Sequence, residues 1–151
     1  MDKTREETII KYVAKNFDFL FNLGFKIGTI EQTGKMSSWK IKLASKEFVI
    51  LLICDKGEWF LTISPAQEEC WIGLDVIIFF ITDEKELIPS FDGDFFLEED
   101  RQFLRLSKNL EKYLKDIKVI FEKDFYLHKD KMIILRKKVN DLQLKRFMEK
   151  N

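Results

Sequence analysis

The side chains that could do chemistry are mainly acids, gathered in one short segment. Residues 83–100 carry eight Asp and Glu residues against Lys85 alone. An EF-hand loop needs its glycine at the sixth position, whereas Gly93 stands second and residues 95–97 are apolar. The spacing of these acids does not identify two carboxylates that could act as a catalytic pair. We therefore expect a charged binding surface here, formed by Asp92, Asp94, Glu98, Glu99 and Asp100.

Histidine and cysteine are too few and too far apart for the common catalytic and metal sites. His128 is the only histidine, and Cys54 and Cys70 lie sixteen residues apart with no CxxC partner. The chain also lacks the GxxxxGK[ST], GxGxxG and GxSxG patterns, which cradle phosphates or present a nucleophilic serine. We expect a protein that is not an enzyme and holds no metal or cofactor. Its histidine should be solvated, and its thiols buried and reduced.

Basic residues follow the acidic segment. Residues 101–151 carry fifteen Lys and Arg against seven acids, so a formal net charge of zero hides two opposed blocks. Lys131, Lys138 and Lys145 repeat every seven residues and could bind the phosphates of a nucleic acid. A pI near 6.6 argues against a broadly basic surface. We favour a solvated helix face that is partly paired with the acids, either within the chain or in a second copy.

The elements that must position these charges begin with a helix. Thr4 and Glu7 have the spacing of a capping box, and apolar residues recur at helical spacing from Ile9 to Phe21. Gly24 suits the position after a helix end, where a left-handed conformation is common. This helix is expected to pack one face on a sheet.

Four strands are predicted next. Residues 25–30 and 39–43 alternate between apolar and polar side chains, as half-buried strands do. Residues 48–54 are apolar throughout, which predicts a central strand with both faces covered. The tight turn at residues 55–57 leads into the strand 58–64, which Pro65 ends. Together they predict an antiparallel meander.

The second half of the chain is predicted to be helical. Residues 71–82 fit either a strand or one face of a helix, and we favour a short buried helix. Two amphipathic helices follow, with apolar stripes at residues 103–125 and 132–147 and a break at residues 126–130. The predicted fold class is α+β, with an N-terminal helix, a four-stranded antiparallel meander, a short buried helix and two C-terminal helices. Residues 1–151 would form a single domain.

Composition narrows the class of protein and the cellular compartment in which we expect it. With 46% hydrophobic residues the chain has ample material for one core. Its longest apolar runs, residues 48–54 and 76–81, are too short to span a bilayer. The polar N-terminus has no signal segment behind it, so we expect a cytoplasmic protein with no membrane partner.

Several local patterns together resemble a group of small uncharacterised bacterial α+β proteins. The patterns are the helix end at residues 19–25, the strand starting at Trp39, the hairpin around residues 55–58, the segment 71–74 and the helical C-terminal stretch. Some proteins of this general kind are immunity proteins of bacterial toxin systems. The resemblance thus implies a protein partner, such as a basic toxin domain, and it carries over no catalytic residue.

We therefore expect a non-catalytic protein-binding module, most concretely an immunity-type inhibitor that blocks a toxin by surface complementarity. The acids named above would be its partner-binding residues, because charged patches accelerate encounter and help to select partners. The alternative is a nucleic-acid-binding accessory protein that uses Lys131, Lys138 and Lys145. An enzyme of unfamiliar type that relies on carboxylates stands third.

Overall fold

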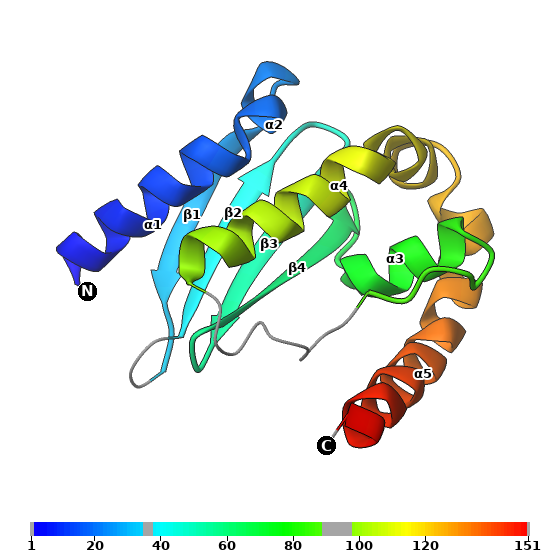
Figure 1. The fold of residues 1–151 in the computed structure, drawn as a ribbon. Coiled ribbons are helices and arrows are strands. Elements are labelled where there is room, and N and C mark those ends of the chain that lie inside the picture. Colours follow the sequence, from blue (N-terminus) through cyan, green and yellow to red (C-terminus); the bar gives the residue numbers. More distant parts are fainter. Residues whose placement is uncertain (1, 35–37, 89–97, 151) are drawn as a thin grey trace.

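The computed structural model describes residues 2–34, 38–88 and 98–150. These residues adopt an α+β fold, as the sequence predicts (Figure 1). The elements, in chain order, are α1 (Lys3–Asn16), α2 (Asp18–Asn22), β1 (Lys26–Gln32), β2 (Trp39–Ala44), β3 (Phe48–Asp55), β4 (Glu58–Pro65), β5 (Ile72–Gly73), α3 (Leu74–Ile81), α4 (Glu99–Glu122) and α5 (Phe125–Lys150).

The strands form one antiparallel sheet in sequence order, β1-β2-β3-β4-β5. β3 lies in the middle, and its Cys54 stands opposite Trp39 of β2 and Trp59 of β4. The predicted meander is confirmed with one addition, because β5 pairs with Thr62 and Ile63 on the outer side of β4. A strand of two residues leaves no alternation in the sequence, so pattern analysis does not detect it.

Helices α1 and α4 lie across one face of the sheet, and α3 and α5 lie beyond its β4 side (Figure 1). The inward row of β3 is at most 1% exposed and consists of Phe48, Ile50, Leu52 and Cys54. Its outward row, on the opposite face, is only half-buried and consists of Val49, Leu51 and Ile53. The central position of this strand is confirmed, whereas full cover on both faces is wrong. Antiparallel sheets can leave one face towards water.

The cap of α1 lies two residues before the predicted one. The side chain of Asp2 accepts the backbone N–H of Arg5 at 3.1 Å, so the capping box at Thr4 is wrong. The helix also ends just before Phe17, and the five-residue α2 completes the segment. Gly24 follows with a φ of +94°, the conformation predicted for it. Asp and Thr are both good caps, so sequence alone does not choose between them.

The ambiguous segment 71–82 holds β5 and then α3, most of which is buried, so the helical interpretation is confirmed. Gln143 of α5 is 6% exposed and ties α3 to the residues that follow it. Its amide donates hydrogen bonds to Asp75 Oδ2 and to the backbone carbonyl of Ile88, at 2.9 Å each. α5 is therefore fixed against α3 by a buried polar contact as well as by apolar packing.

The break between α4 and α5 lies at residues 123–124, so its prediction at residues 126–130 is wrong. The backbone carbonyl of Asp124 accepts the N–H groups of Leu127 and His128 at 3.1 and 3.2 Å. α5 has thus already begun where the sequence shows a gap in the apolar pattern. That gap arises because residues at the start of α5 point away from the core, as Leu127 does with 77% of its surface exposed.

Candidate functional site

α5 carries apolar side chains on two faces. One face is buried, lies against α3 and α4 and includes Phe125, Met132, Leu135 and Val139. The other is exposed: Leu127, Ile134 and Met148 are 77%, 73% and 67% exposed. Of the ten large hydrophobic residues exposed in the described part of the chain, seven belong to α5, and we call these seven the α5 stripe: Tyr126, Leu127, Ile133, Ile134, Leu144, Phe147 and Met148.

One residue of the stripe was expected in the core. The sequence places Phe147 in the same buried row as Met132, yet Phe147 is 42% exposed. Figure 1 shows the reason, because the C-terminal part of α5 extends past α3. Helical spacing predicts which residues share a face and does not show how far the neighbouring elements reach.

A row of three lysines, Lys131, Lys138 and Lys145, runs beside the stripe on the side of α3. Lys138 forms an ion pair with Glu84, and the ammonium of Lys131 lies 5.5 Å from the centre of the Phe80 ring. Lys145 lines a groove together with Glu84 and Glu149. The basic helix and the acidic segment therefore pair in part within the chain, as the sequence analysis favours.

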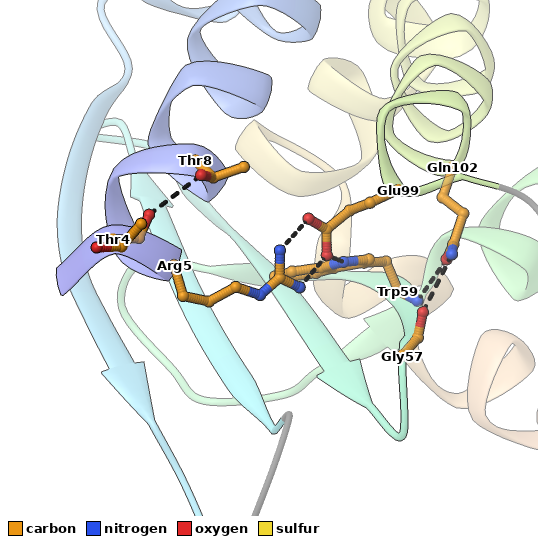
Figure 2. A network of polar contacts seen from close by, with 7 residues as sticks. All are labelled: Thr4, Arg5, Thr8, Gly57, Trp59, Glu99 and Gln102. Carbon is orange, nitrogen blue, oxygen red and sulfur yellow. Dashed lines mark hydrogen bonds and ion pairs between the residues drawn. The ribbon is translucent and has the colours of Figure 1, made fainter. Parts of the chain in front are cut away.

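The acids at the start of α4 face α1 and the sheet (Figure 2). Glu99 is 15% exposed and forms a bidentate ion pair with the Arg5 guanidinium. The same carboxylate accepts the indole N–H of Trp59 at 2.8 Å. The hydrogen bond to Glu99 raises the pKa of Arg5. Glu99 thus joins α1, β4 and α4 at one point.

Asp100 is held in the same way one residue later. It accepts hydrogen bonds from Lys15 Nζ at 2.8 Å and from Asn16 Nδ2 at 3.0 Å. The hydrogen bond from Lys15, with that from Asn16, lowers the pKa of Asp100. Glu98 is exposed at the cap of α4, whereas Asp92 and Asp94 lie outside the described residues. Of the five predicted contacts, Glu99 and Asp100 are therefore occupied by α1.

A further polar clamp holds the hairpin turn between β3 and β4. Gln102 Oε1 accepts the backbone N–H of Trp59 at 2.9 Å, and Gln102 Nε2 donates to the carbonyl of Gly57 at 3.0 Å (Figure 2). Gln102 is 3% exposed, so these two hydrogen bonds are shielded from water. No sequence signal identifies this contact, since glutamine inside a helix is usually solvated.

A cavity of about 290 Å³ lies between β4, the start of α3 and α4. Its walls are mostly apolar and include Phe60, Leu74 and Leu106, with Arg105 adding a polar group. We assign it no ligand, because Ile88 in its wall leads directly into residues that the structure does not describe.

The remaining candidates for chemistry are separated from one another. His128 is half-buried with its ring 5.1 Å from that of Phe80, so the solvated position predicted for it is wrong, because α3 packs beside it. Both cysteines are free; Cys54 is buried and Cys70 half-buried. Burial raises the pKa of the Cys54 thiol to about 11, which makes it a poor nucleophile at neutral pH. Among the described residues, no three His, Cys, Asp or Glu side chains are grouped to hold a metal ion.

Comparisons with known proteins found no match for this chain. No protein family matches the chain, and no curated protein and no solved structure is significantly similar to it. Within the described residues, no helix is both long and apolar enough to cross a membrane. Any function therefore has to be inferred from the surface and the contacts of this chain.

Proposed function

We propose that the protein is a non-catalytic protein-binding module, most concretely an immunity-type inhibitor that covers part of a toxin. The α5 stripe is the observation that carries this proposal. Monomeric proteins usually expose apolar residues singly, and a larger exposed apolar patch is typical of an interaction surface. Seven such side chains on one helix of 26 residues make α5 the surface that we assign to the partner.

The acids predicted as contacts contribute less to this surface than their number suggests. Glu99 and Asp100 already pair with Arg5 and Lys15, so a partner could use them only by breaking those contacts. Glu98 is exposed and stays a candidate contact for a basic partner. Leu127, Ile134 and Met148 are apolar and mostly exposed, so a partner can bury them without first breaking an ion pair, which favours α5 as the main binding surface.

Nucleic-acid binding ranks second. Its proposed contacts are Lys131, Lys138 and Lys145, and phosphates would have to compete with Glu84 for Lys138. The apolar stripe beside this row offers nothing to a phosphate backbone, whereas a protein surface can bury it. The stripe therefore favours a protein partner over a nucleic acid.

The test compares two exposed apolar positions. Tagged wild-type protein, Ile134→Glu and the control Val119→Glu are used to capture partners from lysate of the source organism, nuclease-treated or untreated, at low and high salt. Ile134 is 73% exposed on α5 and Val119 46% exposed on α4, so both variants should fold normally. We expect one stoichiometric protein with the wild type and the control, lost with Ile134→Glu. Equal capture by Ile134→Glu, or recovery of nucleic acid alone from untreated lysate, contradicts the proposal.

A further inference from the structure

α5 is a basic helix whose cations are mostly engaged by other groups of the chain. It carries eight Lys and Arg against three Asp and Glu. Most of these cations contact an acid, a backbone carbonyl or an aromatic ring, and the pairs are Lys129–Glu68, Lys131–Phe80, Arg136–Trp71, Lys137–Asp141, Lys138–Glu84 and Arg146–Leu87. A phosphate that bound α5 would therefore have to replace a partner that is already present.

Glu84 reaches the lysine row through an unusual backbone turn. The chain reverses directly after α3, where Asp83 and Glu84 have φ of 55° and 65°. Residues other than glycine, asparagine and aspartate seldom adopt this left-handed conformation. The N–H of Glu84 donates to the backbone carbonyl of Phe79 at 2.7 Å, which holds the turn in place. The carboxylate of Glu84 is thereby placed against Lys138.

An acid at this point divides the lysine row. Lys131 and Lys145 lie fourteen residues apart, which at 1.5 Å per residue is about 21 Å along the helix. Lys138 lies halfway between them, and its ammonium group is paired with Glu84. Lys145 lines a groove that also contains Glu84 and Glu149. A polyanion lying along α5 would therefore meet carboxylates among the lysines.

We infer that Glu84 is a specificity-determining residue, because it keeps nucleic acid off the lysine row of α5. Lysines bind phosphates by charge, without regard to sequence, so a basic helix with unpaired lysines attracts nucleic acid in general. A carboxylate among the lysines repels phosphates and competes for Lys138, whereas it does not hinder an apolar contact with a protein. The inference goes beyond the proposed function and does not depend on which protein binds α5.

The ion pair itself contributes little to folding. The side chains of Lys138 and Glu84 are 56% and 34% exposed, and ion pairs so accessible to solvent add little stability. Removing the carboxylate should therefore leave the fold intact. Its effect should appear in the binding of anions instead, so the two roles can be told apart.

The probe is a short labelled DNA duplex of mixed sequence, and fluorescence anisotropy measures its binding to the full chain at several salt concentrations. We expect Glu84→Gln to bind the duplex about two- to fivefold more tightly than the wild type at low salt, because one partly exposed ion pair no longer competes. The slope of log Kd against log salt should steepen by about one, because one more lysine contacts phosphate.

The matched control is Glu7→Gln, which makes the same change in net charge at an exposed residue of α1. α1 and α5 lie on opposite sides of the molecule (Figure 1). Glu7→Gln should therefore bind the duplex as the wild type does. Circular dichroism and thermal melts check that each variant keeps the wild-type fold, so that a change in binding is not a loss of structure.

A double variant tests whether Lys138 carries the effect. Lys138→Gln removes the cation that Glu84 occupies. Adding Glu84→Gln to this background should no longer steepen the salt dependence, because no further lysine is released. The gain in affinity should shrink for the same reason.

Tighter binding with a steeper salt dependence, seen only while Lys138 is present, supports the inference. It is overturned if Glu84→Gln gains nothing, if Glu7→Gln gains as much, or if neither the wild type nor Glu84→Gln binds the duplex at low salt. An undiminished gain in the Lys138→Gln background also overturns it, because net charge alone would then explain the result. Capture of the cellular protein by the wild type and its loss with Ile134→Glu test the proposed function separately from all of these outcomes.

Discussion

The contact of Glu99 with Arg5 and Trp59 is predicted to be a main source of stability at the helix-covered face of the sheet. In Glu99→Ala the carboxylate disappears, and both donors lose their acceptor. Trp59 is 1% exposed, so water cannot easily replace the lost acceptor of its indole N–H. The Arg5 side chain is 32% exposed and can be rehydrated. The two donors therefore contribute unequally to the loss.

The size of the loss follows from these two environments. A buried donor left without an acceptor costs about 1–3 kcal/mol. The partly exposed ion pair with Arg5 adds about 1 kcal/mol at most, because solvent screens it. We expect Glu99→Ala to lower the free energy of unfolding by about 1–4 kcal/mol. In a domain of this size that corresponds to a fall in Tm of about 2–16 °C.

Urea unfolding followed by tryptophan fluorescence measures this loss, with Glu98→Ala as the matched control. Glu98 is the adjacent acid, is exposed and makes no side-chain capping bond, so its removal should change stability by no more than about 0.5 kcal/mol. Glu99→Gln keeps an acceptor for Trp59 and should fall between the two. A Glu99→Ala variant as stable as Glu98→Ala would refute the argument, and would return Glu99 to the set of acids available to a partner.

Two further results are expected. The stability that Asp100 contributes is present above its unfolded pKa of about 4 and is lost as pH falls through its lowered folded pKa. The difference in free energy of unfolding between wild type and Asp100→Asn should therefore shrink in acid. A difference that stays constant between about pH 7 and 2 contradicts the hydrogen bond from Lys15. In the native protein at pH 8, Ellman's reagent should react with Cys70 well before buried Cys54, and with both at one rate only after denaturation; equal rates in the folded protein would show that Cys54 is accessible.

The hairpin of β3 and β4 could be predicted in detail because its signals are local. Residues 48–54 are strongly apolar, and the turn at residues 55–58 contains a glycine where a positive φ is needed. In the structure Lys56 and Gly57 have φ of 52° and 85°, as a two-residue hairpin loop requires. Where the sequence offered two equivalent signals, as for the cap of α1, the prediction failed.

The contacts of the acidic residues could not be predicted, because they join distant parts of the chain. Arg5 and Glu99 lie 94 residues apart, and no local pattern connects them. The sequence shows correctly that acids collect before α4 and that such charges suit a helix N-terminus. It does not show that α1 lies alongside α4 and takes up two of them (Figure 1).

The two faces of α5 explain why its stripe is exposed in a well-packed domain. Both faces satisfy the helical spacing that predicts burial, and the lysines at residues 131, 138 and 145 stand between them. Rotating α5 to bury the stripe would carry Asp130, Lys137 and Asp141, which lie on the same side of the helix, towards the core, where a charge without a partner is strongly destabilising. Only the face with Met132 and Val139 can therefore pack on the rest of the domain. The stripe stays outside because burying it would also bury the charged residues on its own side of the helix, and breaking or isolating a buried charge costs more than the apolar contacts would gain.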